Sequence, residues 1–325
     1  MLKINVVIPV FNAQRFIGDA IQSVMDQTFK DLEIIVVDDG STDGTEKIVR
    51  QFSGPISYCR QQNKGAGVAR NLGVSLSQGD WIAFLDADDV WYPYKLAVQV
   101  EHIETHAGVS FFYSDMDMID ENGQVRERGL LSSELKRRKE KKPWDIASIA
   151  FNNLPFPYPS TTLFRKDVFS KAGGFNPIFG GSNFEDFDLF ARIARITPLF
   201  FVPQSLVKYR IHTAQGTTDR LTWQRNYLIL LSSLLELWGD DPKKKSVVAS
   251  NLAKYYTREG KNLVRAGNYH KARQCFQKSS FYRPLYWKNL RRWALSYLPA
   301  VRELYVAWKR KKPDPIHKDI LPGQQ

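Results

Sequence analysis

The stretch 82-IAFLDADDVWYP-93 places a short apolar run directly before three carboxylates, those of Asp86, Asp88 and Asp89. The apolar run is typical of a buried strand, and ionised groups at its end are costly unless a cation or hydrogen-bond donors satisfy them. Asp86 and Asp88 are two positions apart, so an extended backbone would point both to one side. Together they suit a hard divalent cation with oxygen ligands, although an acidic turn without a ligand can have the same sequence.

The residues before this stretch alternate apolar runs with amphipathic segments. Strands are expected at four apolar runs, namely 6–10, 34–37, 56–58 and 81–85. Helices are expected between them, the first capped by Asn12 and the third spanning 66–76. This alternation predicts a mostly parallel sheet covered on both faces, in which ligands bind at the carboxyl ends of the strands. Asn12, 38-DDGSTDG-44 and the acidic turn all follow strands, so one crevice should hold them.

Beyond residue 95 the pattern indicates a smaller, mixed α/β region. Helices are expected over 96–106 and 185–196, and extended segments over 109–120 and 199–212. The segment 132–145 is rich in charge and is expected to be a loop.

From about residue 221 the sequence predicts helices alone. The section 253–284 fits the helix-turn-helix pattern of a tetratricopeptide-like repeat, with Gly267 and Asn268 at the turn. Its packing positions are Tyr256, Gly260, Ala272, Phe276 and Pro284. A single repeat cannot bury its own face, so it should pack on the rest of the chain. The expected domains are 1–218, 219–312 and a flexible tail, 313–325.

The basic character of the chain belongs to its last third. The net charge is +12, and residues 216–325 alone hold 22 Lys and Arg against 8 Asp and Glu. Within them, 281–312 interleaves aromatic with basic side chains, which suits the headgroup region of an anionic membrane. The alternative is that these aromatic side chains pack on the rest of the protein and the lysines only solvate the end.

The sequence contains no sign of export. The N-terminus lacks the long apolar region of a signal peptide, and no apolar run has the length of a membrane-spanning helix. The two cysteines, Cys59 and Cys275, are in no metal-ligand spacing. We therefore expect a cytoplasmic protein, either free or peripheral on the cytoplasmic membrane face.

Six motifs in one order resemble the family 2 glycosyltransferases of GT-A fold. They are VVIPVFNAQRFIGDAIQSVMDQTFKDLEIIVVDDGSTDGT, NKGAGVARNLG, GDWIAFLDADDVWYP, GGFNP, EDFDLFARI and YRIH, within about residues 3–215. The resemblance implies a Rossmann-like, mixed and mostly parallel sheet with flanking helices, followed here by an all-α extension. It implies an enzyme that moves a sugar from a nucleotide-sugar donor, expected to be UDP-linked, to a hydroxyl of a glycan, lipid-linked or other acceptor. Cell-surface polysaccharide synthesis is the expected setting.

The resemblance also implies roles for residues that would bind the donor. Pro9, Phe11 and Asn12 would line the nucleotide pocket, with Phe11 where the family often has Tyr. Asp39 would accept a hydrogen bond from the uracil ring, and Asp38 would support the loop. From the residues alone, two acids before Gly-Ser could equally form a helix-capping turn.

Three further residues are expected around the donor's diphosphate. Arg70 would lie on the third helix, where a guanidinium suits phosphate or ribose recognition, although it could also be an exposed helix arginine. Asp88 would hold Mn²⁺ or Mg²⁺, with Asp86 on the ribose, the metal or a metal-bound water. His212 would reach the metal or the diphosphate, unless it is structural. The cation would stabilise the departing diphosphate as a Lewis acid.

The catalytic base is expected at the start of the helix over 185–196. Glu185 and Asp186 stand where the helix dipole favours the ionised form, and an ionised carboxylate can remove the proton of an acceptor hydroxyl. In the family this pair includes the base of an inverting transferase, so Asp186 is the expected base. Plain helix capping is the alternative.

Other classes of protein fit the sequence less well. No Q-x-x-R-W motif follows the expected base, which disfavours a processive synthase. A nucleotidyltransferase would need a glycine-rich basic loop, and 9-PVFNAQRF-16 has no glycine. The remaining alternative is a catalytically inactive, glycosyltransferase-like scaffold, against which Asp39, Asp88 and Asp186 argue. The motifs indicate a sugar nucleotide and no nucleic acid. The acceptor is expected to be selected by the stretch 120–160.

Overall fold

The computed structural model describes residues 2–137, 157–180, 184–213 and 220–284. The chain divides into two compact units, residues 1–237 and residues 238–325. This division falls later than the boundary expected after residue 218, because helix α9 (Arg220–Leu237) belongs to the first unit. Trp223 and Tyr227 of α9 pack against Phe184, the first residue of helix α8 (Phe184–Ile193).

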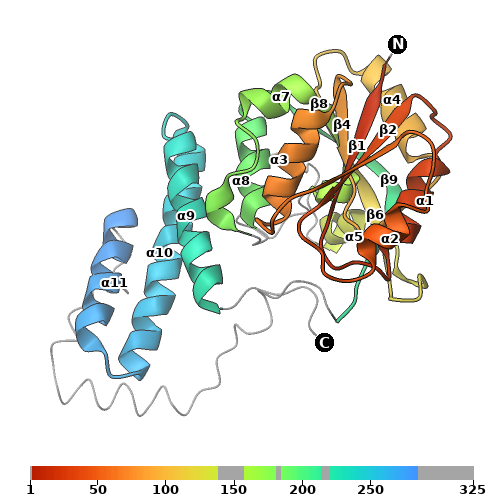
Figure 1. The fold of residues 1–325 in the computed structure, drawn as a ribbon. Coiled ribbons are helices and arrows are strands. Elements are labelled where there is room, and N and C mark those ends of the chain that lie inside the picture. The colour runs from red at the N-terminus through yellow and green to blue at the C-terminus, as the bar shows by residue number, and fades with distance from the viewer. Residues whose placement is uncertain (1, 138–156, 181–183, 214–219, 285–325) are drawn as a thin grey trace. The chain divides into compact units, whose positions relative to one another are not determined.

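Within the described residues, one mixed sheet of nine strands forms the centre of the first unit (Figure 1). The strands are β1 (Ile4–Val10), β2 (Leu32–Asp38), β3 (Ile56–Arg60), β4 (Trp81–Phe84), β5 (Val90–Trp91), β6 (Phe111–Ile119), β7 (Val125–Glu127), β8 (Thr162–Arg165) and β9 (Leu199–Arg210). Their order is β3-β2-β1-β4-β8-β6-β9-β5, and β7 pairs with β6. The expected combination of a parallel half with a mixed half is confirmed.

The parallel half consists of β3, β2, β1 and β4. Helices α1 (Ile17–Met25) and α2 (Thr45–Val49) lie on one side of it, and helix α3 (Ala66–Leu76) lies on the other (Figure 1). Every residue of β1 is buried, as in strands covered on both faces. Helix α3 comes so close to β1 at Gly73 that a Cβ there would overlap the side chain of Val7. Gly73 therefore sets the distance between α3 and the sheet.

Asn12 does not cap helix α1, which is a correction to the sequence-based expectation. It has a positive φ of 49°, a conformation that asparagine tolerates better than most residues. Its Oδ1 accepts from the backbone N–H of Thr42 at 2.7 Å, and its own N–H donates to Ser41 Oγ at 2.9 Å. Asn12 thereby joins the loop after β1 to the loop after β2.

The mixed half of the sheet begins with β8, which runs antiparallel to both β4 and β6. Its helices are α4 (Lys95–Thr105), α5 (Leu130–Arg137), α7 (Lys166–Lys171) and α8. Residues 132–137 were expected in a loop but belong to α5. The carboxylate of Asp115 on β6 accepts from the N–H groups of Leu131 and Ser132 at 2.8 and 3.0 Å, which stabilises the start of that helix. The rest of the expected loop, 138–145, lies outside the described residues.

The second unit contains helices α10 (Pro242–Arg265) and α11 (Tyr269–Tyr282), as the repeat pattern predicted. A Cβ on Gly260 would lie 2.6 Å from the ring of Phe276, so the glycine permits the close packing of the two helices. Gly267 has a positive φ of 77° at the turn, and Asn268 Oδ1 accepts from Lys271 N–H at the start of α11. Packing of this pair on the first unit stays a prediction. Most of 281–312, and the tail 313–325, lie outside the described residues.

None of the helices in the described part of the chain combines the length and the apolar character needed to cross a membrane.

Candidate active site

The end of β2 and the loop after it hold two buried acids that are bonded within the protein. Asp38 Oδ1 accepts from Ser41 N–H, and its Oδ2 accepts from the hydroxyl of Tyr58, both at 2.7 Å. Asp39 accepts from the Gln61 side chain and from the backbone N–H groups of residues 64 and 65, at 2.7 to 2.8 Å. These three bonds leave about one of the roughly four acceptor positions of an ionised carboxylate. Asp39 thus joins the end of β2 to the start of α3.

The other residues expected around the nucleotide lie on β1 and just beyond it. Pro9 is buried within β1, whereas the Phe11 side chain is half exposed at the end of that strand. Asn12 occupies the tight turn already described, with its amide oxygen on the loop after β2. The structure therefore brings the loops after β1 and β2 together, as expected.

The acidic stretch after β4 is a turn and not an extended segment. Asp89 N–H donates to the carbonyl of Asp86 at 3.1 Å, so the extended backbone expected from Asp86 to Asp88 is not present. Asp86 Oδ1 lies 2.5 Å from Arg70, and Asp88 Oδ2 lies 2.9 Å from His212 Nε2. The two acids that the sequence paired are therefore held by different partners.

Two residues that sequence reasoning did not place at this turn hold it. Arg210, at the end of β9, donates its backbone N–H to Asp89 Oδ1 at 3.0 Å and its Nε–H to the carbonyl of Asp88 at 2.8 Å. Ser160 accepts from Asp86 N–H at 3.0 Å and donates to Asp89 Oδ2 at 2.5 Å. Arg210 lies within the quoted motif YRIH, which was a signal, whereas nothing in the sequence near Ser160 indicated its contacts.

Burial raises the pKa values of the two acids at the end of this turn. The pKa of Asp89 is raised well above its ordinary range by burial and then by Asp88 and Asp86. Burial and the charge of Asp86 also raise the pKa of Asp88, while the contact with His212 opposes that shift. A positive charge close to this turn would relieve the repulsion that both shifts reflect.

The pair Asp88 and His212 is the candidate metal centre. Among the described residues, no group of three or more His, Cys, Asp and Glu side chains is arranged to hold a metal ion by itself. Two ligands at right angles on an octahedral cation, each about 2.1 Å away, would be about 3 Å apart. Asp88 Oδ2 and His212 Nε2 are 2.9 Å apart, which is compatible with this spacing and is also the distance of a direct hydrogen bond. These are the two side chains that would hold a cation at this turn.

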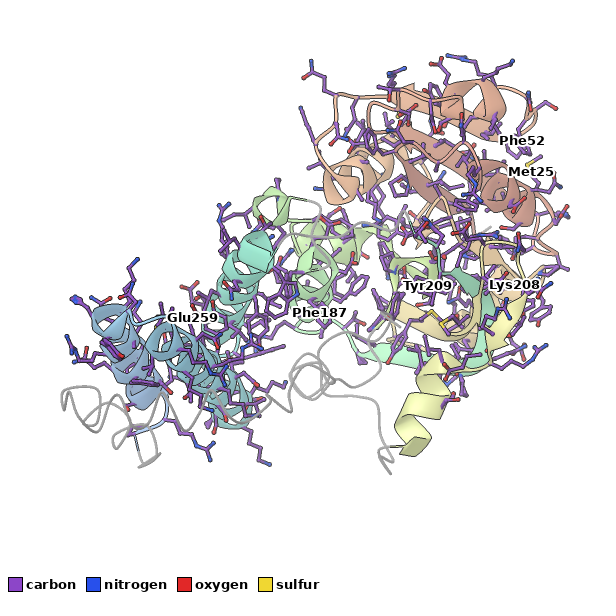
Figure 2. All side chains as sticks on the ribbon, turned by 90° about the horizontal axis from the view of Figure 1, so that it is seen from below. Met25, Phe52, Phe187, Lys208, Tyr209 and Glu259 are labelled. Carbon is purple, nitrogen blue, oxygen red and sulfur yellow. The ribbon has the colours of Figure 1, made fainter. Side chains whose placement is uncertain are left out.

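Aromatic side chains lie beside the acids. The ring of Phe16 is tilted by 40° against the imidazole of His212, with centroids 4.8 Å apart, and lies 4.9 Å from the guanidinium of Arg210. Tyr209, labelled on β9 in Figure 2, meets Tyr158 edge-on with ring centroids 5.2 Å apart. Burial, followed by the charge of Asp89, raises the pKa of both tyrosines, so their hydroxyls stay protonated at neutral pH.

Arg70 is buried and binds acids of the protein, so it is not the exposed helix arginine of the alternative interpretation, and its role on the phosphate or ribose stays a prediction. Its guanidinium lies 2.5 Å from Asp86 Oδ1, 3.3 Å from Glu185 Oε1 and 3.5 Å from Asp186 Oδ1. Burial alone would lower the pKa of Arg70, but these three carboxylates raise it above its ordinary value. Arg70 is therefore a permanent positive charge among them.

The pKa of Asp186 differs from the expectation that its carboxyl group is ionised. The helix dipole was expected to favour its ionised form, but burial raises its pKa to about 8, with Glu185 and Asp86 adding to the shift and Arg70 opposing it. Among the described residues its Oδ1 has no hydrogen-bond partner, although the atom is buried. A carboxyl group of this kind takes up a proton readily near neutral pH.

The mixed sheet, the acidic turn after β4 and the paired acids of α8 define a glycosyltransferase of GT-A fold. The family model of glycosyl transferase family 2 matches residues 5–173. An uncharacterised glycosyltransferase of Rickettsia prowazekii is 30% identical over 234 residues, which are 72% of this chain and 71% of that protein. This chain therefore belongs to glycosyl transferase family 2, and it is a glycosyltransferase.

Two other similar proteins have more descriptive names. The putative teichuronic acid biosynthesis glycosyltransferase TuaG of Bacillus subtilis is 36% identical over 125 residues, 37% of this chain and 49% of that protein. The crystal structure of S. aureus TarS 1–349 in complex with UDP-GlcNAc has a TM-score of 0.66 and 18% sequence identity. That match covers 94% of this chain and 92% of the TarS chain, and it shows a common fold.

Proposed function

We propose that this chain is an inverting, metal-dependent glycosyltransferase that uses a UDP-sugar donor and Asp186 as its catalytic base. The observation that carries the proposal is the state of Asp186. Its carboxyl group is buried, its Oδ1 lacks a hydrogen bond from the described residues, and its pKa of about 8 lies near the operating pH that favours a general base.

The donor is placed by the loops at the carboxyl end of the parallel strands. The remaining acceptor position of Asp39 takes the N–H of the uracil ring, beside the half-exposed side chain of Phe11. Pro9 and Asn12 shape the same pocket, and Asp38 fixes the loop after β2. The TarS complex with UDP-GlcNAc supports a UDP-sugar on this fold.

Asp88 and His212 would hold Mn²⁺ or Mg²⁺, and the cation, when bound, supplies positive charge to the departing diphosphate. Arg210 and Ser160 keep the turn that carries Asp88 in place through the bonds described above. The role of Asp86 on the ribose or the metal stays a prediction. Its Oδ1 already binds Arg70, so this role would fall to Oδ2.

The reaction is one displacement at the anomeric carbon. The acceptor hydroxyl attacks that carbon, and Asp186 takes the hydroxyl proton as the new carbon–oxygen bond forms. The bond between the sugar and the diphosphate breaks at the same time, and its electron pair leaves with the diphosphate. Because the acceptor enters opposite the leaving group, the product has the inverted anomeric configuration.

The acceptor is a glycan or a lipid-linked glycan in cell-surface polysaccharide synthesis. The support is the likeness to TuaG, which is named for teichuronic acid biosynthesis. Attachment to an anionic membrane surface through the basic C-terminal part belongs to the same proposal, because lipid-linked acceptors lie there.

A panel of UDP-, GDP- and dTDP-sugars tests this function. With Mn²⁺ present, we expect release of the nucleoside diphosphate from at least one UDP-sugar, faster with an acceptor than without, and a product whose anomeric NMR signals differ in configuration from the donor's. Retention of configuration would contradict Asp186 as the base of a single displacement. Failure to bind any member of the panel would favour the inactive, scaffold-like alternative.

A further inference from the structure

One face of helix α3 lies against Phe175 and against Glu185 at the start of helix α8; Figure 1 shows α3 and α8. Gly67, Arg70 and Asn71 are separated by three and four residues along α3, so they share this face. Each of them lies against Phe175 or Glu185. This face is therefore the surface against which Glu185 and Asp186 are held.

Asn71 fixes the approach to α8 by two hydrogen bonds to one residue. Its Nδ2–H donates to the carbonyl of Phe175 at 2.9 Å, and its Oδ1 accepts from the N–H of Phe175 at 2.8 Å. The ring of Phe175 in turn lies 5.3 Å from the guanidinium of Arg70. The aromatic ring and the two bonds thus locate Arg70 relative to the start of α8.

Gly67 allows Glu185 to come within contact distance of the helix backbone. A Cβ at residue 67 would lie 2.9 Å from Glu185 Oε2 and 3.1 Å from the Cβ of Phe175. Glu185 is buried at this point and its Oε1 lies 3.3 Å from Arg70. A side chain at 67 would therefore displace the carboxylate from the guanidinium.

We propose that Arg70 is a positioning residue whose guanidinium fixes the carboxylates of Glu185 and Asp186 for proton transfer. The inference rests on the proposed function, because it takes Asp186 as the catalytic base. The geometry carries it: the only acids within ion-pair distance of Arg70 among the described residues are Asp86 and these two. A planar guanidinium can hold several carboxylates in fixed directions, which a lysine ammonium cannot do.

This role differs from recognition of the donor's phosphate or ribose. The Arg70 side chain is 5% exposed, and its two terminal nitrogens are directed at carboxylates of the protein. A donor phosphate would have to compete with those carboxylates for the same nitrogens. Arg70 therefore acts on turnover through Glu185 and Asp186, while its contact with Oδ1 of Asp86 leaves Oδ2 of that carboxylate for the donor.

The experiment is a double-mutant cycle of Arg70→Lys and Asp186→Asn, with UDP in Mn²⁺ as the binding probe and the active donor of the panel as the substrate. Arg70→Lys alone should lower kcat by about 10²-fold, since a small misplacement of a catalytic group costs about that much. UDP affinity should change by less than about twofold. In the Asp186→Asn background, Arg70→Lys should lower kcat by less than about twofold more, because groups that act as one unit are not additive.

Gly67→Ala is the second variant, because alanine is a good helix former and the substitution adds or removes no charged group. It should lower kcat without weakening UDP binding. Arg192→Lys is the matched control: Arg192 pairs with Asp188 on the same helix, and its effect should multiply with that of Asp186→Asn.

The outcomes separate the two proposals. In one outcome, Asp186→Asn lowers kcat and the effect of Arg70→Lys on kcat multiplies with it; in another, Arg70→Lys weakens UDP binding tenfold. In either case the positioning role is wrong and the proposed function stands. If Asp186→Asn keeps full activity, the catalytic base of the proposed function is wrong, and Arg70 cannot act through it.

Discussion

Nε2 of His212 lies 2.9 Å from Oδ2 of Asp88, across a separation of 124 residues in the chain. The contact exists because β9 ends beside the acidic turn that follows β4. Arg210, two residues before His212, binds that turn through two hydrogen bonds. Two elements from different halves of the sheet therefore supply the two side chains of the candidate metal centre. The predictions below begin with this pair.

Asp88→Asn should abolish transfer, because the amide cannot replace an anionic ligand of a hard cation. Titration calorimetry with UDP should find binding weakened at least about tenfold in Mn²⁺ and unchanged within about twofold in EDTA. The matched control is Asp117→Asn, in the second D-x-D sequence, 115-DMD-117. Asp117 accepts from Gly129 N–H and from the Tyr92 hydroxyl, so its loss should lower stability without changing the metal dependence of UDP binding. Equal UDP affinity of wild type and Asp88→Asn under both conditions would remove the metal site.

The rate of transfer should rise with pH until Asp186 is ionised. A base with a pKa of about 8 is mostly protonated at pH 6, so kcat/KM should increase about tenfold per pH unit and level off above about pH 8. Asp186→Asn should lower kcat by about 10²-fold or more and remove this rise. The measurement is a pH–rate profile at saturating Mn²⁺, with UDP affinity followed in parallel. A profile that is flat between pH 6 and 8 in the wild type would assign the proton transfer to another group.

Lys95 should make the folded state less stable as the pH falls. It is fully buried, donates to Gln99 Oε1 at 2.7 Å, and lies 4.0 Å from the ring of Trp91. Burial lowers its pKa well below the ordinary value of 10.5, so the unfolded state binds the proton more readily than the folded state. Its contribution to stability therefore rises with pH between the folded pKa and the unfolded one.

Lys95→Met removes this dependence. Between pH 9 and pH 7, the free energy of unfolding of the wild type should fall relative to the variant by up to about 1.4 kcal/mol per pH unit. Urea unfolding at three pH values measures the difference, and the exposed Lys64→Met is the control that should give a constant difference. A constant difference for Lys95→Met as well would mean that the buried lysine keeps its proton.

The basic C-terminal part should bind anionic membranes. The full chain should sediment with vesicles of anionic lipid and be released by high salt, because each well-placed cation contributes about 1 kcal/mol that salt screens. A chain that ends at residue 286 should stay in the supernatant. Neutral vesicles are the control, and equal sedimentation of the two chains would exclude the basic part as the membrane anchor.

Much of the catalytic unit could be predicted because its signals are local. The alternation of apolar runs and amphipathic segments predicted β1 to β4 and α3, whose observed bounds agree closely. Polar residues directly after these strands had to meet at one edge of the sheet, and the structure brings Asn12 and the loop after β2 together. In the second unit, the small residue Gly260 opposite Phe276 indicated the helix pair in the same way.

The contacts that decide the site depend on long-range packing, and they could not be predicted. Ser160 binds two acids that are more than seventy residues away, and its neighbours in the sequence have no pattern that would indicate this. The contacts of Arg70 with Glu185 and Asp186 depend on where α8 comes to lie, so the sequence of α3 alone could not indicate them. The raised pKa of Asp186 could not be predicted for the same reason, since burial by distant segments outweighs the local helix dipole.

Gly73 has no polar side chain and contacts no acid, yet the position of helix α3 on β1 depends on it. A larger residue at position 73 would push α3 away from Val7. Arg70, one turn earlier on the same helix, would move with it. The substitution would then lower the catalytic rate of the enzyme. A screen that measures only folded protein would record it as an ordinary change in the core. In a mutational survey of this enzyme, residue 73 should behave like a member of the catalytic machinery, and a compensating reduction at Val7 should restore it.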